Sequence, residues 1–255
     1  TLSGTIPASF CNLRKLRTFN IMGCSFSGVL PPCLLEGMDN LHQIDFSLNN
    51  FEGPIPRLSP RLSARLESFN FGYNLLNGTL DALAAEPAFS TEALELNNNR
   101  LSGTLPPRLL LVTSALWLDN NRLVGDLPAL LPVNLNSFTV SNNAFDGYLP
   151  EIEFPTALQV IDISGTRITG TIPASYGNIS DLIMLTMRDN LLIGSIPIEF
   201  ERLTELNFLD LSSNQLSGSI PNFRAARQMV TLELSNNLFT QAPRNLPQSL
   251  DRLDL

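Results

Sequence analysis

A short motif recurs along almost the whole chain at intervals of 22 to 25 residues. It has the form N-x-L/F-x-G-x-I/L-P, and each copy follows an L-x-L segment or its equivalent. A fixed period of this length is typical of solenoids, in which each repeat is one turn that stacks on its neighbours. We therefore expect about ten stacked turns. The Asn of the motif, or the residue that replaces it, lies at Cys24, Asn49, Asn74, Asn99, Asn121, Asn143, Thr166, Asn190, Asn214 and Asn237.

The pattern L-x-x-L-x-L-x-x-N assigns a role to each residue of a turn and accounts for the 47 Leu and 25 Asn of the chain. Alternating apolar residues point to one side of a short strand, so stacked strands form a parallel sheet over an apolar interior. The Asn also points inward, where its amide bonds backbone groups that would otherwise be buried without a partner. Cys24 and Thr166 are tolerated substitutions in this scheme. We call the remaining motif residues the Asn ladder: Asn49, Asn74, Asn99, Asn121, Asn143, Asn190, Asn214 and Asn237.

The second half of the turn carries G-x-I/L-P, for example at residues 4–7, 170–173 and 218–221. Gly permits a tight bend, and Pro fixes φ and removes a backbone donor. This signature resembles the plant-type leucine-rich repeat of plant receptor-like kinases, receptor-like proteins and polygalacturonase-inhibiting proteins, and is also similar to protist surface proteins with such repeats. The resemblance implies a right-handed, α/β-type leucine-rich repeat solenoid. Its parallel sheet would line the concave face, with short second strands and 3₁₀ segments on the convex side.

We interpret residues 1–255 as a single solenoid domain. Two stretches, 56–62 and 81–87, do not match the usual filler and are expected to lengthen the convex side. Asp81 stands where the motif has Pro, and Gln241 where it has Gly. The chain starts within a turn and stops within a strand, without the paired-cysteine caps common at the ends of such domains. Because solenoids need capping turns, we expect a fragment of a longer chain, or ends that partners cover.

Three cysteines lie in the first two turns: Cys11, Cys24 and Cys33. Cys24 occupies an Asn position and is expected to be a buried thiol. Cys11 and Cys33 occupy the convex parts of neighbouring turns, where a disulfide is one alternative and two free thiols are the other. No pair has the C-x-x-C spacing of a zinc or redox site.

Charge and composition argue against several functions. The formal net charge of −8 and the lack of a basic run disfavour nucleic acid and anionic membrane surfaces as partners. No apolar stretch is long enough to insert into a membrane. His42 is the only histidine, so neither a metal centre nor a Ser-His-Asp triad is supported. We expect no enzyme activity, no cofactor and no metal.

Residues between the inward-pointing apolar positions should face outward from the concave sheet, and the register arranges them in columns. One column is acidic at six of its eleven positions. This column favours a basic or hydroxyl-rich partner, although a solvated face kept soluble by charge is the alternative. The column runs Asn20, Asp45, Asn70, Glu95, Trp117, Thr139, Asp162, Thr186, Asp210, Glu233 and Asp254.

The neighbouring column holds three large apolar residues in consecutive turns, Val160, Met184 and Phe208. Exposed apolar patches beside charge often mark interaction sites. Tyr73 and Trp117 are further outward aromatics, a residue type enriched at binding hot spots. The alternative is that flanking loops or missing chain cover them.

Two sequons, at Asn77 and Asn178, are glycosylation candidates if the chain enters the secretory pathway. The resemblance then implies a non-enzymatic recognition module of an extracellular or cell-surface protein, which binds a protein, peptide or glycan ligand through the concave face. A structural scaffold subunit, held permanently in a larger intracellular or organellar assembly that covers its open ends, is the alternative. The expected ligand-binding residues are Val160, Met184, Phe208, Asp162, Asp210, Trp117, Tyr73, Glu95 and Glu233.

Overall fold

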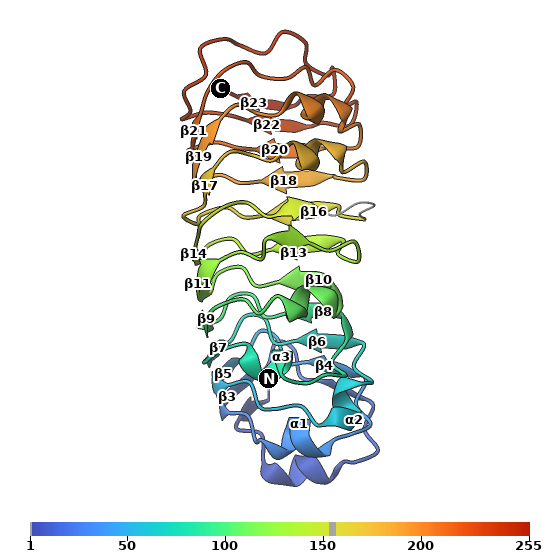
Figure 1. The fold of residues 1–255 in the computed structure, drawn as a ribbon. Coiled ribbons are helices and arrows are strands. Elements are labelled where there is room, and N and C mark those ends of the chain that lie inside the picture. The colour runs from blue at the N-terminus through green and yellow to red at the C-terminus, as the bar shows by residue number, and fades with distance from the viewer. Residues whose placement is uncertain (1, 153–156) are drawn as a thin grey trace. The chain divides into compact units, whose positions relative to one another are not determined.

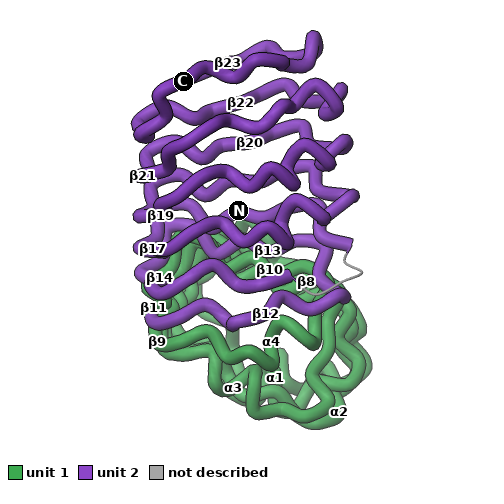
Figure 2. Tube along the Cα trace, turned by 45° about the horizontal axis from the view of Figure 1, so that its top comes forward, with its two compact units in different colours: residues 1–124 green, residues 125–255 purple. Residues whose placement is uncertain are grey.

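The computed structural model describes residues 2–152 and 157–255. Two compact units divide the chain, residues 1–124 and residues 125–255 (Figure 2). Each unit is a stack of turns that contributes one short strand per turn to a parallel main sheet (Figure 1). The leucine-rich repeat solenoid expected from the motif is therefore the fold of the chain.

The main sheet follows the predicted L-x-L segments. In the first unit its strands are β2 (Thr18–Asn20), β4 (Gln43–Asp45), β6 (Ser68–Asn70), β8 (Thr91–Glu95) and β10 (Thr113–Trp117). In the second unit they are β13 (Ser137–Thr139), β16 (Val160–Asp162), β18 (Met184–Thr186), β20 (Phe208–Asp210), β22 (Thr231–Glu233) and β23 (Arg252–Asp254). Strands of successive turns are neighbours in each unit, as a solenoid requires.

A second set of short strands follows the Asn positions. In the first unit these are β1 (Ser3–Gly4), β3 (Ser25–Val29), β5 (Asn50–Pro54), β7 (Leu75–Asn77) and β9 (Ser102–Gly103). The boundary between the units falls within β11 (Arg122–Asp126). In the second unit this set comprises β14 (Ala144–Asp146), β17 (Thr169–Gly170), β19 (Leu191–Gly194) and β21 (Gln215–Leu216). β12 (Leu130–Leu131) and β15 (Glu151–Ile152) lie further along their turns and pair with each other in a separate parallel sheet.

The outer segments differ between the units. The first unit has the 3₁₀ helix η1 (Ala8–Asn12) and the α-helical turns α1 (Cys33–Gly37), α2 (Pro60–Ser63), α3 (Asp81–Ala84) and α4 (Arg108–Leu111). The second has the 3₁₀ helices η2 (Ala174–Asn178) and η3 (Ile198–Arg202). The unusual stretches 56–62 and 81–87 thus supply α2 and α3. Ser59 caps α2, because its Oγ accepts a hydrogen bond of 3.1 Å from the Leu62 amide.

The interior of each unit consists of the inward apolar residues of the repeat, nearly all of them fully buried. In the first unit many of these positions hold Phe. The rings of Phe19 and Phe46 lie 4.9 Å apart, and those of Phe46 and Phe71 lie 5.1 Å apart. Stacked turns therefore bury a continuous aromatic row in the first unit, which adds specific ring contacts to the apolar burial.

Every ladder Asn bonds backbone groups where the chain leaves its strand. Asn214 is representative: its Nδ2 donates to the carbonyl oxygens of Met187 at 2.9 Å and of Leu211 and Ser212 at 3.2 Å. Its Oδ1 accepts a hydrogen bond of 3.0 Å from the Leu192 amide in the preceding turn. One side chain thus satisfies four backbone groups in two turns.

The two ladder substitutions differ from each other. Thr166 is buried, and its Oγ1 lies 3.1 Å from the Ile163 oxygen and 2.5 Å from Oδ1 of Asn190, so it remains bonded to the ladder. Cys24 was expected to be a buried thiol, but it is a free, half-buried cysteine.

A disulfide joins Cys11 of η1 to Cys33 of α1, with their Cα atoms 5.8 Å apart. The sequence left this bridge as one of two alternatives. The structure decides between them, because η1 packs against α1 and brings the two cysteines within bonding distance.

Candidate ligand-binding surfaces of the main sheet

The strand register aligns the expected surface residues in the second unit. Val160 pairs with Met184, and Met184 with Phe208. In the neighbouring column Asp162, Thr186, Asp210 and Glu233 are aligned in the same way. Strands of adjacent turns lie about 4.8 Å apart, so three turns place three apolar side chains in one short row.

The apolar row is partly accessible. Val160, Met184 and Phe208 are each half-buried, whereas the residue that follows each of them, such as Leu209, is fully buried in the core. Alternation along the strand therefore places the row on the outer face of the sheet. A ligand that covered this row would bury additional apolar surface without disturbing the interior.

The carboxylates beside this row are less available than expected. Asp162 is half-buried, and its Oδ1 accepts a hydrogen bond of 2.9 Å from the Ser164 amide. Asp210 was expected to be an outward charge, yet it is only 3% exposed. Its Oδ1 accepts hydrogen bonds from the Ser212 amide at 3.0 Å and the Ser212 hydroxyl at 2.6 Å. Of the two Asp residues beside the apolar row, Asp162 is therefore the more accessible.

Basic residues also reduce the local negative charge. Nε of Arg188, a residue that the column analysis did not include, lies 4.0 Å from Oδ2 of Asp210 and 3.9 Å from Oδ2 of Asp189. Nε of Arg252 lies 3.1 Å from Oε1 of Glu233. The second unit thus presents a mixed-charge border around an apolar row rather than a uniform anionic stripe.

A short sequence pattern indicates which carboxylates accept a hydrogen bond within their own turn. Asp45, Asp162 and Asp210 are each followed two positions later by Ser, and in each case the carboxylate accepts a hydrogen bond from that Ser amide. Asp followed at this spacing by a bonded backbone amide forms an Asx-turn. The D-x-S spacing therefore marks carboxylates that use Oδ1 within their own turn, and the exposure of each side chain decides whether a ligand can still reach it.

The first unit contains the remaining expected residues. Trp117 is paired in register with Glu95 and is 36% exposed. Burial raises the pKa of the half-buried Glu95 carboxyl, and the negative charge of Asp45 raises it further. Tyr73, 52% exposed, lies in the turn after β6 with φ of 56°, the position before the ladder Asn. It is therefore not part of the strand column.

Both glycosylation candidates are accessible. Asn77 ends β7 and Asn178 ends η2, and both are exposed. Oδ1 of Asn178 accepts a hydrogen bond of 2.8 Å from Nη1 of Arg202. Nothing else in the structure bears on their modification, so this remains a prediction.

Comparison with known proteins agrees with the geometry. A sequence model described as leucine rich repeat matches residues 156–216. The structure of the plant peptide hormone receptor RGFR1 in complex with RGF2 superimposes with a TM-score of 0.88 and 26% identity, and the match covers 99% of this chain and 42% of that chain. This chain is a leucine-rich repeat protein.

Curated relatives of this leucine-rich repeat chain come from plants. Receptor-like protein 35 of Arabidopsis thaliana is 33% identical over 175 residues, which are 68% of this chain and 16% of that protein. Receptor-like protein EIX2 of Solanum lycopersicum is 41% identical over 195 residues, which are 74% of this chain and 19% of that protein. The leucine-rich repeat chain therefore spans less than a fifth of the length of these two relatives.

The helices of the leucine-rich repeat chain are short. Within residues 2–152 and 157–255, none is long and apolar enough to cross a membrane.

Proposed function

We propose that this chain is a non-enzymatic recognition module, outside the cell or at its surface, that binds a peptide or protein ligand on the outer face of its main sheet. The row of Val160, Met184 and Phe208 carries the proposal. These residues are aligned in register in consecutive strands, and each is half-exposed. The receptor-like relatives support a recognition role in general.

The charged residues beside the apolar row indicate which chemical groups the ligand would carry. A ligand with an apolar anchor would bury the row, and a basic group beside that anchor would face the half-buried Asp162. Anchor burial should dominate affinity, because border charges act mainly on association rate and salt dependence. The similarity to the plant peptide hormone receptor RGFR1, whose structure is a complex with RGF2, favours a peptide over a glycan.

Selection from a random peptide library on the chain, followed by affinity measurement of the selected peptides, tests the proposal. We expect peptides with an aromatic or aliphatic anchor next to Lys or Arg. Phe208→Ala should weaken their binding about 30-fold, the equivalent of roughly 2 kcal/mol for a hot-spot residue.

Ile198→Ala is the matched control, because Ile198 is an exposed apolar residue of η3, away from the main sheet. It should leave affinity unchanged, and melting temperatures should show that both variants fold. Equal binding by the parent chain and Phe208→Ala would reject the apolar row as the site. Recovery of the chain only within a permanent assembly, with no peptide selected, would favour the scaffold function.

A further inference from the structure

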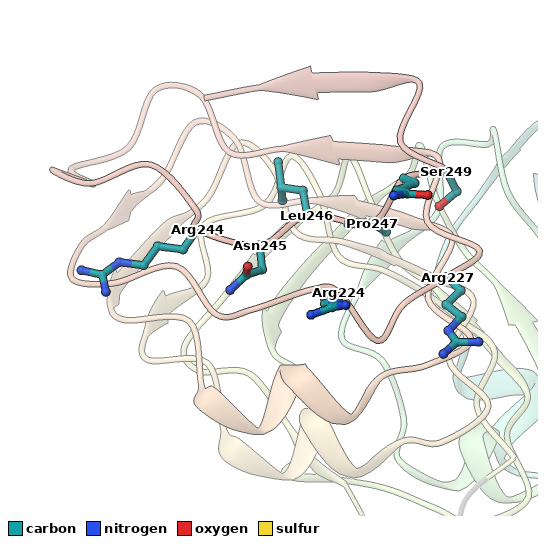
Figure 3. Close-up of a pocket in the computed structure, with 8 residues that line it drawn as sticks. Arg224, Arg227, Arg244, Asn245, Leu246, Pro247 and Ser249 are labelled. Atoms are coloured by element: carbon teal, nitrogen blue, oxygen red, sulfur yellow. The ribbon is translucent and has the colours of Figure 1, made fainter.

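A row of arginines lines a cavity of about 640 Å³ near the end of the second unit. Arg224 and Arg227 belong to the segment before β22, and Arg244 belongs to the next turn, before β23. Figure 3 shows Arg244 at one end of the space between these two segments, Arg227 at the other end, and Arg224 between them. The cavity therefore lies outside the main-sheet strands that carry the apolar row.

The three guanidinium groups are chemically available. All three side chains are exposed, and none forms an ion pair or a side-chain hydrogen bond with another residue of the described chain. The other lining residues add polar groups from Asn245, Gln248 and Ser249 and contribute no carboxylate. A cleft lined by one sign of charge concentrates ligands of the opposite sign.

The cavity coincides with a break in the repeat. Residues 238–250 contain no strand, and Gln241 replaces the Gly of the motif. Pro247 is buried and the Ser249 hydroxyl donates a hydrogen bond of 2.7 Å to the Met229 carbonyl oxygen, which holds this irregular turn against the preceding one. The space between the two turns is thus bounded by structured chain on both sides.

We propose that Arg224, Arg227 and Arg244 form a binding site for a short acidic peptide segment with two or three carboxylates. Guanidinium groups bind carboxylates bidentately, and arginines in a row suit an extended segment better than one compact anion. The lining contains no aromatic ring on which a sugar could stack.

A long polyanion does not fit this site. The chain has a net charge of −8, and Glu201 and Glu205 line neighbouring cavities together with Arg227. These carboxylates would repel the flanks of a nucleic acid, whereas a short segment can stay within the first cavity, whose lining has no carboxylate.

Calorimetric titration with the blocked peptide Asp-Gly-Asp-Gly-Asp tests the site, with Asn-Gly-Asn-Gly-Asn as the uncharged control. The acidic peptide should bind the parent chain and the uncharged one should not. The triple variant R224Q/R227Q/R244Q should weaken binding at least about tenfold. The triple variant R57Q/R100Q/R167Q removes the same charge from exposed arginines outside the cavity and should bind as the parent does.

Titrations with two other anions test the class of ligand. Tighter binding of a galacturonic acid trimer than of the acidic peptide, or equal binding of inorganic sulfate, would overturn the peptide assignment. Equal peptide binding by both triple variants, or none by the parent chain, would overturn the site. If the first triple variant does not fold, the Nε–H resonances of Arg224 and Arg227 in the parent chain decide: they should shift on peptide addition, and unchanged resonances would reject the site.

Discussion

At the scale of single residues, the turns depend on polar side chains that bond their own backbone. The Asn ladder joins two consecutive turns, while Asp210 closes only the turn in which it lies. In both cases a buried polar side chain forms hydrogen bonds with the backbone. Replacing it with an apolar side chain should therefore lower the free energy of unfolding. The residue before each ladder Asn adopts a positive φ, for example 54° at Asp189 and 54° at Ser213.

Replacing Asn214 with Leu should lower the free energy of unfolding by about 1 to 3 kcal/mol, because four backbone groups lose their partner inside the core. Denaturant titration measures the change as a lower midpoint with an unchanged slope. Gln215→Leu, at the adjacent exposed position, is the control and should have little effect. Equal midpoints for the two variants would contradict the role of the ladder.

The raised pKa of Glu95 predicts a pH dependence of stability. The folded state holds this proton more tightly than the unfolded state, so the stability contribution is complete below the unfolded value of 4.5 and is lost as pH rises through the folded pKa. Glu95→Gln should therefore raise the melting temperature at neutral pH and have no such effect well below pH 4.5. A lower melting temperature of Glu95→Gln at neutral pH would contradict the raised pKa of Glu95.

At the scale of elements, the outer segments determine how closely neighbouring turns approach. In the second unit η2 packs on η3, and Gly177 of η2 lies against the backbone of Glu199. A Cβ atom there would overlap the carbonyl carbon and Cβ of Glu199 and lie 2.7 Å from its carbonyl oxygen. Gly177 is thus required by close approach of two backbones.

Gly177→Ala should cost about 1 to 3 kcal/mol of stability, since backbone atoms must move to admit the methyl group. Thermal unfolding followed by circular dichroism measures this loss. Gly37→Ala is a matched control, because a Cβ at Gly37 of α1 meets nothing within 4 Å. Gly37→Ala should leave stability unchanged or raise it slightly, because Ala lowers the entropy of the unfolded chain. A loss of equal size in both variants would contradict close packing at Gly177 as its cause.

At the scale of the whole molecule, each turn is stabilised by its neighbours, so protection should vary along the stack. In the second unit β20 pairs with both β18 and β22, whereas among the strands of residues 2–152 and 157–255 β23 pairs with β22 alone. All three residues of β23 are exposed, and Leu253 is 44% exposed.

Hydrogen exchange should therefore be faster in β23 than in β20, because the terminal strand has fewer buried contacts to break before it opens. Mass spectrometry of peptides that cover Phe208–Asp210 and Arg252–Asp254 measures the difference. Equal protection of the two strands would show that the second unit opens as one cooperative body.

The sequence alone determined the repeat, the strand register and the inward position of the Asn ladder. These features follow from local periodicity, since alternation along a strand and a regular spacing of Asn are properties of neighbouring residues. The same periodicity predicted that Val160, Met184 and Phe208 lie in one row.

Only the tertiary structure decided which residues are close across different turns. The bridge between Cys11 and Cys33, the ion pair of Arg188 with Asp210, and the row of Arg224, Arg227 and Arg244 all depend on such contacts. Outer segments vary in length and conformation from turn to turn, so their side chains have no fixed register. The distances between these side chains depend on how the turns stack, and the period of the sequence does not predict them.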